Sequence, residues 1–414
     1  MAEIRKMGYC VNGEWKESKA EKYMDVTDSS TGEVIAQVPC CTPDEVEEAI
    51  ASAQAAFPEW SSLSLAKRQQ YMFRWRDVLY AHKEELSELC AKELGKNIKE
   101  ARGDVQKAIE PTEEACALPA MIQGDAAMQV TTGYDTATYR KPLGVTAGIV
   151  PMNFPAMIPW GWMVPLSIAC GNTVVLKASS QTPLTSMRIM ELFYTEGRFP
   201  KGVVNLVTCS RVEADILLTD ERVKAVTFVG TTGVGKQVYS KAAAHGKRVQ
   251  AQCEAKNHAL VLDGRNVAVP GYENGFFVGP TILDHVTPEM TVGNREIFGP
   301  VTCIKRVKDY EEGIKIMNAN PFANGSCIFT QSGYYSRKFA METDGGMVGI
   351  NVGIPVPTAY FPFSGNKDSF FGDLHVLGKD GYRFFTRAKT VTTHWFDEAA
   401  GKRKVGTWEG STEA

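Results

Sequence analysis

A glycine-rich turn that links an apolar strand to a helix is the clearest candidate for chemistry in this sequence. It reads Gly230-Thr-Thr-Gly-Val-Gly235-Lys236 and follows the apolar run Val226-Thr227-Phe228. Glycines at the start of a helix let an anion approach the free backbone N–H groups, so the turn predicts a site for a nucleotide phosphate. Taken alone, the same turn is equally consistent with a purely structural role.

The turn nearly matches the P-loop of nucleoside triphosphatases, G-x-x-x-x-G-K-[ST]. However, Gln237 stands where that motif has the hydroxyl residue that holds Mg²⁺. The sequence also offers no later strand that ends in a lone aspartate to complete such a site. A nucleoside triphosphatase is therefore disfavoured, while a phosphate of another nucleotide still fits the turn.

The segments around this turn alternate between strands and helices. We expect strands at 145–150, 173–177, 203–207, 225–228 and 247–253, with helices between them at 155–170, 184–196, 212–218 and 233–245. Such alternation is typical of parallel βαβ units and predicts an α/β fold with a doubly wound parallel sheet. The stretch 145–170 is strongly apolar, but its four prolines argue against a membrane-spanning helix.

The pattern changes on both sides of this region. Helices are expected at 44–57, 65–95 and 309–318, and strands at 276–283, 301–306 and 326–329. Residues 127–140 alternate like a β-hairpin arm, and 390–396 alternate like an edge strand that could pair with that arm. Because exposed strand edges are readily satisfied across subunits, we expect a homodimer or a homotetramer.

Five strings together carry a resemblance to a known family. They are Gly148-Ile-Val-Pro-Met-Asn-Phe-Pro155, Gly171–Pro183, Phe228–Gly235, Glu296-Ile-Phe-Gly-Pro300 and Pro362–Lys367. In this order, the sequence resembles the aldehyde dehydrogenase superfamily over nearly its whole length. The resemblance implies an NAD-binding domain at 1–125 and 145–252, an incomplete α/β catalytic domain at 253–385, a β oligomerisation arm at 126–144 and 386–400, and a tail at 401–414.

The resemblance also implies roles for individual residues. Asn153 matches the asparagine whose amide stabilises the oxyanion of the tetrahedral intermediate. Lys177 matches the lysine that holds the adenosine ribose, Thr231 the pyrophosphate contact, and Glu296 the carboxylate that positions the nicotinamide ribose. The implied cofactor-binding set is Asn153, Phe154, Lys177, Ser180, Gln181, Gly230, Thr231, Gln252 and Glu296. The expected cofactor is NAD. Because Ser180 stands where many NAD-preferring members have glutamate, NADP stays an alternative.

A second group of strings resembles one branch of that family. Gln252-Cys-Glu-Ala-Lys-Asn-His258, Asp373–Gly381 and Thr390–Trp395 are similar to the CoA-acylating methylmalonate-semialdehyde dehydrogenases. Gln252 stands where hydrolytic members keep a glutamate that activates water, and an amide cannot accept that proton. Coenzyme A is therefore the expected acyl acceptor. Lys107 stands where this branch has an arginine for the substrate carboxylate, and it keeps the charge without the bidentate fork.

The family's nucleophile is missing from this sequence. Catalysis there requires a cysteine thiolate in a Gly-Gln-x-Cys string after the Glu-Ala-Lys-Asn-His strand. Here Leu260-Val261-Leu262 runs directly into Asp263-Gly-Arg-Asn266, which resembles a later part of the catalytic domain. Cys253 is the nearest thiol, but strand alternation points it away from the face used by Gln252. The block is either absent from the protein or absent only from this sequence, and an intact mass well above 45.4 kDa would indicate the latter.

Composition excludes several other classes. The chain has 414 residues, 44% of them hydrophobic, and a formal net charge of -3, which gives no reason to expect nucleic acid or a membrane as partner. Its ten cysteines show no CxxC spacing and there are six histidines, so no metal site is expected. Unpaired cysteines in apolar runs, and an N-terminus without a signal peptide, favour the cytoplasm.

Two hypotheses follow. The first is an oxidoreductase that by descent converts malonate or methylmalonate semialdehyde to acyl-CoA with NAD, impaired here because the nucleophile is absent. The second is a catalytically inactive NAD-binding subunit. A third activity, oxidation of aldehydes by water, is disfavoured by Gln252. The ligands in each case are small molecules.

Overall fold

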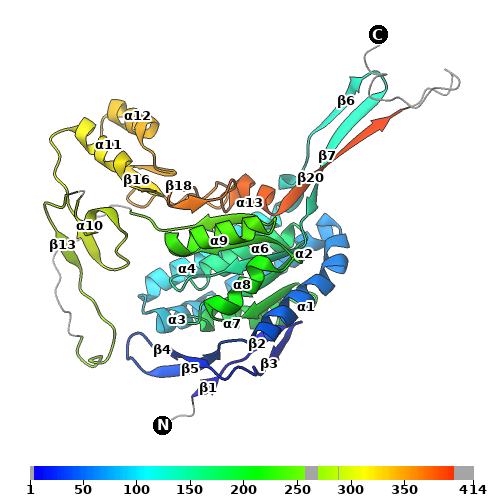
Figure 1. Cartoon of the computed structure of the whole chain (residues 1–414), viewed down its shortest axis with the longest axis horizontal. Coiled ribbons are helices and arrows are strands. Elements are labelled where there is room, and N and C mark those ends of the chain that lie inside the picture. Colours follow the sequence, from blue (N-terminus) through cyan, green and yellow to red (C-terminus); the bar gives the residue numbers. More distant parts are fainter. Residues whose placement is uncertain (1–3, 257–268, 288, 396–414) are drawn as a thin grey trace.

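The computed structural model describes residues 4–256, 269–287 and 289–395. Its centre is an eight-stranded sheet in the order β19-β12-β11-β8-β9-β10-β2-β3 (Figure 1). The middle five strands run parallel and are β8 (Val145–Ile149), β9 (Thr173–Lys177), β10 (Val204–Val207), β11 (Val223–Val229) and β12 (Arg248–Gln252). This confirms the expected α/β fold.

Helices cover both faces of the sheet, as the nearly continuous apolar character of its strands requires. One face packs against α1 (Pro43–Ser62), α8 (Arg211–Thr219) and α9 (Thr232–Ala244). The other packs against α2 (Leu65–Ala81), α3 (Lys83–Leu94), α4 (Ile98–Cys116), η1 (Ile158–Met163), α6 (Val164–Ala169) and α7 (Leu184–Thr195). A short helix, α5 (Leu118–Met121), follows α4.

The connection order creates a switch point in this sheet. From β8 the chain adds β9 and then β10 on one side, and it returns to add β11 and then β12 on the other side. The helices that follow β8 and β11 therefore leave the sheet in opposite directions, which opens a crevice at the carboxyl ends of these strands. The switch point lies between β8 and β11, where Ile149 pairs with Phe228.

Antiparallel strands complete the sheet at both edges. β2 (Tyr9–Val11) and β3 (Glu14–Lys16) extend it beside β10, and β19 (Phe370–Phe371) pairs with β12. A separate three-stranded sheet is formed by β1 (Arg5–Lys6), β5 (Val34–Pro39) and β4 (Tyr23–Thr27). β19, a strand from the C-terminal half, thus lies directly at the edge of the central sheet.

The arm forms as the alternating pattern predicted. β6 (Ala126–Thr131), β7 (Tyr134–Pro142) and β20 (Thr386–His394) make a three-stranded sheet in the order β20-β7-β6 that projects from the body (Figure 1). β20 pairs with β7 over its whole length, from Thr386 opposite Pro142 to His394 opposite Tyr134. The strand expected at 390–396 therefore begins earlier, at Thr386, and ends at His394. Residue 396 lies outside the described residues.

Residues 281–350 of the C-terminal half form small units that lie on the opposite side of the body from the arm, whereas residues 378–384 lie beside the arm (Figure 1). Apart from β19 and β20, the strands of the C-terminal half pair in twos: β13 (Thr281–Leu283) with β14 (Val301–Cys303), β15 (Phe322–Ala323) with β18 (Asn366–Lys367), and β16 (Gly325–Ile328) with β17 (Met347–Ile350). Its helices are α10 (Thr291–Asn294), α11 (Tyr310–Ala319), α12 (Gly333–Glu342) and α13 (Gly378–Phe384). Two-stranded sheets bury little surface, and Phe298, Phe329 and Ile354 are each more than 60% exposed.

Several expected boundaries are wrong. The helix expected at 65–95 is two helices that meet at His82, and the helix expected at 155–170 starts at Ile158 with a π-helical turn. The strand expected at 276–283 is reduced to β13, because Phe276 and Val278 are exposed and lack a paired strand among the described residues. The strand expected at 301–306 ends at Cys303. The junction at which Leu260-Val261-Leu262 runs into Asp263-Gly-Arg-Asn266 lies outside the described residues.

Some helices were not expected. α4 contains Gly103 and Pro111, two residues that ordinarily disfavour a helix, yet it is held by burial of Val105, Ala108 and Ile109. α12 and α13 were also missed. Within the described residues, no helix combines the length and apolar character that crossing a bilayer requires.

Burial of Glu114 on α4 gives a testable pH dependence. Its side chain is fully buried, and burial raises the pKa of the carboxyl from 4.5 to about 8, opposed in part by the N–H of Gly378. The folded state therefore holds a proton that the unfolded chain releases, so wild-type stability falls as pH rises from about 4.5 to about 8. We expect Glu114→Gln to raise the melting temperature at pH 9 and to leave it nearly unchanged at pH 5.

The exposed Glu88 on the neighbouring helix provides the control, and Glu88→Gln should have little effect at either pH. Thermal unfolding of the three proteins at both pH values decides the matter. A melting temperature for Glu114→Gln that falls below wild type at pH 9 would contradict the argument.

Candidate functional site

A cleft of about 700 Å³ opens at the switch point, between α8 and α9. Its floor contains Ile149 at the end of β8, Lys177 at the end of β9 and Phe228 on β11. The walls come from α8 and α9, and they comprise Arg211, Ala214, Asp215, Leu218, Val234, Gln237, Val238, Ser240 and Lys241. Ligands of doubly wound sheets bind outside the carboxyl ends of the strands, so this cleft is the candidate site.

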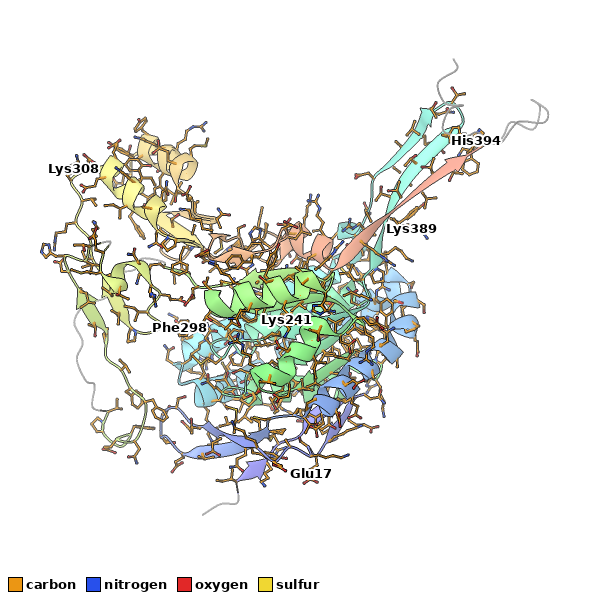
Figure 2. The ribbon with its side chains drawn as sticks, viewed as in Figure 1. Glu17, Lys241, Phe298, Lys308, Lys389 and His394 are labelled. Carbon is orange, nitrogen blue, oxygen red and sulfur yellow. The ribbon has the colours of Figure 1, made fainter. Side chains whose placement is uncertain are left out.

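The cleft combines apolar walls with a few charged groups at its rim. The nearest hydrogen-bond contact of the Lys177 ammonium is the carbonyl oxygen of Ala178 at 3.4 Å, which leaves most of its donor capacity for a ligand. Lys241, near the centre of Figure 2, bridges to Asp215 on α8 with a distance of 2.6 Å between Nζ and Oδ2. A flat apolar ring carrying hydroxyl or phosphate groups fits this lining.

The charged residues at the rim of the cleft, Arg211, Asp215 and Lys241, were not expected, although their helical spacing in the sequence is visible. Arg211, Asp215 and Leu218 share one face of α8 at helical spacing, and Val234, Val238 and Lys241 share one face of α9. Such faces identify a helix that packs against a neighbour. They do not say that the two helices leave a gap between them, which depends on where the sheet places each one.

The start of α9 lies at the same edge of the sheet. Thr231 is its N-cap residue, is exposed, and makes no capping hydrogen bond with its side chain. Gly230 donates its backbone N–H to the carbonyl oxygen of Gln252 at 3.1 Å, which joins the turn to the end of β12. The backbone N–H of Thr232 donates to Oε2 of Glu254 at 3.0 Å. The turn that predicted a phosphate site thus already holds a carboxylate of this chain.

Glu296 and Gln252 lie beside that turn. Glu296 is half-buried and accepts a hydrogen bond from the backbone of Ala255, and burial raises the pKa of its carboxyl, with the charge of Glu254 adding to the shift. Gln252 is 3% exposed and donates Nε2 to the carbonyl oxygen of Phe363 at 3.5 Å. Its Oε1 has no partner within the described part of the chain. Gly230, Thr231, Gln252 and Glu296 are therefore gathered around the ends of β11 and β12.

Asn153 lies half-buried in the turn that follows β8. This turn is held at Met152, whose carbonyl oxygen accepts from Oγ1 of Thr182 at 2.6 Å. It is also held at Met157, whose N–H donates to the buried carboxyl of Asp104 at 2.7 Å. Burial raises the pKa of that carboxyl, whose partner Lys96 lies 3.1 Å away.

The remaining predicted residues lie apart from the cleft. The ring of Phe154 packs under the ammonium of Lys96, 3.6 Å from the ring centroid. Ser180 and Gln181 follow β9 in a segment that does not line the cleft. Lys107 lies on α4, and its ammonium pairs with Glu110 one turn away at 2.7 Å. Their proposed roles stay predictions.

Cys253 follows β12 directly, and its sulfur lies on the side of α9. Sγ occupies the space that a side chain at Gly235 would need, whereas the amide of Gln252 faces Phe363. Burial, together with the charges of Glu254 and Asp368, raises the pKa of the Cys253 thiol to about 12. All ten cysteines are free thiols, and six of them are buried. The Cys253 thiol thus lies toward α9, and its surroundings disfavour the thiolate form.

Comparisons with known proteins agree on one family. The model of the aldehyde dehydrogenase family matches residues 15–269 and 260–391. The chain is 38% identical to malonate-semialdehyde dehydrogenase from Listeria innocua serovar 6a over 483 aligned positions, which cover 95% of this chain and 99% of the relative. Malonate-semialdehyde dehydrogenase 1 from Oceanobacillus iheyensis is also 38% identical, over 485 positions, with 95% and 99% covered.

Solved structures give the same result. A methylmalonate-semialdehyde dehydrogenase from Oceanimonas doudoroffii superposes with a TM-score of 0.92 and 35% identity, covering 96% of this chain and all of that one. A protein from Sinorhizobium meliloti 1021, described as a methylmalonate-semialdehyde dehydrogenase and solved with NAD, gives 0.93 and 30%, covering 97% of this chain and all of that one.

The alignments also reveal a difference in length. The 483 aligned positions exceed the 414 residues of this chain, so the relative has positions without a counterpart here. The two family matches meet at residues 260–269.

The environment of Cys253 predicts low reactivity. With its pKa raised to about 12, the thiolate fraction at pH 8 should be about a thousand-fold smaller than that of a free cysteine. We expect iodoacetamide to label Cys253 very slowly in the native protein, as measured by peptide mass spectrometry over time. Labelling in denaturant is the control and should be fast. Fast labelling of the native protein would show that the thiol is exposed and ionised.

Proposed function

The chain belongs to the aldehyde dehydrogenase family, and from this premise we propose that it binds NAD in the cleft between α8 and α9. We further propose that it descends from an enzyme that converts malonate or methylmalonate semialdehyde to acyl-CoA. As it stands, the chain lacks the thiolate that this reaction needs. The missing thiolate is supported by one observation. The alignment with the relative spans 483 positions although this chain has 414 residues, and the two family matches meet at residues 260–269.

The cleft suits a dinucleotide. Ile149, Leu218 and Val238 provide apolar contact for an adenine ring, and Lys177 can donate to the hydroxyls of its ribose. Thr231 continues the face of α9 that carries Val234, Val238 and Lys241, so a ligand in the cleft can extend to the start of that helix. The likeness to a protein solved with NAD supports the same assignment.

The remaining site residues suit acyl transfer to a thiol. NAD, when bound, supplies the hydride acceptor. Asn153 can donate its amide to an aldehyde oxygen as negative charge develops there. Gln252 cannot take a proton from water, which favours coenzyme A as the acyl acceptor. The names of the curated relatives support malonate or methylmalonate semialdehyde as the ancestral substrate.

A second candidate, an inactive NAD-binding subunit, is favoured by the intact cleft together with the intact arm. Both outer strands of the arm, β6 and β20, keep one edge open within the described residues. The arm also exposes Met128, Val130, Tyr139 and Val391. We propose that the arm pairs with a second copy of the chain. We also propose that the protein is cytoplasmic, which its free thiols support.

NAD titration tests the cofactor assignment. We expect isothermal titration calorimetry to detect binding, and Lys177→Ala to weaken it roughly ten- to hundred-fold, since a hydrogen bond to a charged group contributes about 1.5–3 kcal/mol. Lys308→Ala removes a lysine of the same charge in the C-terminal half, labelled in Figure 2, and should leave binding unchanged. Absence of NAD binding by the wild type would overturn the cofactor assignment.

NADH formation tests the missing nucleophile. With malonate semialdehyde, NAD and coenzyme A, we expect no increase in absorbance of NADH above the rate without protein. If NADH forms and Cys253→Ala abolishes it, the proposed loss of the nucleophile is wrong.

The arm predicts the oligomeric state. Val130→Asp together with Val391→Lys places charges on both outer strands, which should shift the protein to a lower mass in size-exclusion chromatography with light scattering. Val307→Lys, at an exposed position of the C-terminal half, is the control. A wild type that already runs as a monomer would refute pairing through the arm.

A further inference from the structure

The N-terminus of α9 is satisfied by a carboxylate that comes from another element. The side chain of Thr231 does not cap the helix. Instead, Oε2 of Glu254, two residues after β12, accepts the backbone N–H of Thr232 at 3.0 Å. The backbone N–H of Glu254 donates in turn to Oγ1 of Thr232 at 3.3 Å. The two segments are thus joined reciprocally, as in a capping box built from distant residues.

This arrangement places a negative charge where a dinucleotide brings another. A pyrophosphate bound at the switch point accepts hydrogen bonds from the free N–H groups at the helix start and is stabilised by the helix dipole. Glu254 uses the same N–H group and the same end of the dipole. A ligand phosphate must therefore displace the Glu254 carboxylate or bind beside it.

Neighbouring charges do not relieve this conflict. Burial and the charge of Glu254 raise the pKa of the half-buried Glu296 carboxyl, and the charge of Lys256 offsets this only in part. Lys236, one turn into α9, is the nearest ammonium on that helix, but it is paired with Asp368 at 3.1 Å. In addition, the backbone carbonyl oxygen of Asp368 accepts a hydrogen bond from Oγ1 of Thr232. The start of α9 therefore faces more carboxylate than ammonium.

We propose that Glu254 is an internal competitor of the cofactor, which weakens dinucleotide binding by occupying the helix end that the pyrophosphate needs. The proposal rests on the assignment of NAD to the cleft between α8 and α9. It makes Glu254 a determinant of cofactor affinity that acts through charge. Its effect should depend on the presence of a pyrophosphate in the ligand and should diminish as salt screens the charge.

The test compares wild type with Glu254→Gln, which keeps an oxygen acceptor for the N–H of Thr232 and removes only the charge. We expect the dissociation constant for NAD to fall roughly ten-fold, in line with charge effects at helix ends. Adenosine, which has no pyrophosphate, should bind both proteins equally. The difference for NAD should shrink between about 0.01 M and about 1 M salt.

A matched control is available at another helix. Asp309 caps α11 by accepting the N–H of Glu312 at 2.9 Å, so Asp309→Asn removes the same charge at a helix start outside the cleft. It should leave NAD binding unchanged. Without ligand, Glu254→Gln should melt slightly below wild type because its cap is weaker, while NAD should raise its melting temperature by a larger step.

Two outcomes overturn the proposal and are distinguishable. If wild type binds NAD and Glu254→Gln binds it equally or more weakly, Glu254 is not a competitor, and the cofactor assignment stands. If neither protein binds NAD, the cofactor assignment itself fails and this inference with it.

Discussion

The carboxyl ends of five parallel strands lie on one side of the central sheet, and three of these strands form the floor of the candidate site. Their carboxyl ends place Ile149, Lys177 and Phe228 on the floor of a cleft, and α8 and α9, which pack on the same face of the sheet, wall it. The same side carries the start of α9 and the end of β12. Because these groups depend on strand register, the cleft is positioned by the central sheet and not by the small units of the C-terminal half.

The C-terminal half has no comparable constraint within the described residues. Apart from β19 and the arm strand β20, its strands pair only in twos, and large apolar side chains such as Phe298 and Ile354 stay exposed. A parallel pair such as β16 and β17 is ordinarily part of a wider sheet that is buried on both faces. The alignment with a relative has more positions than this chain has residues. This difference fits an ancestor in which additional segments covered these surfaces. Exposed strand edges of this kind leave a chain prone to association.

Sequence reasoning predicted the parts of this structure in which local pattern and tertiary packing agree. β9 was placed at its true bounds, and α7 and α9 were placed within a residue or two, because apolar periodicity there matches burial. It failed where packing overrides local preference, as in α4 with Gly103 and Pro111, and where an apolar run finds no paired strand, as at Phe276. The carboxylate of Glu254 at the start of α9 could not be foreseen, because that contact joins two elements whose separation only the fold sets.

We propose that this chain keeps a cofactor cleft but offers no thiolate to an aldehyde. The most direct test is the intact mass of the protein after incubation with malonate semialdehyde and NAD, without coenzyme A. A working nucleophile would exchange its thiol hydrogen for an acyl group, with hydride passing to NAD, and would add the mass of that acyl group. We predict an unmodified protein of 45.4 kDa that still binds NAD. An acyl adduct that maps to any of the ten cysteines would contradict the account.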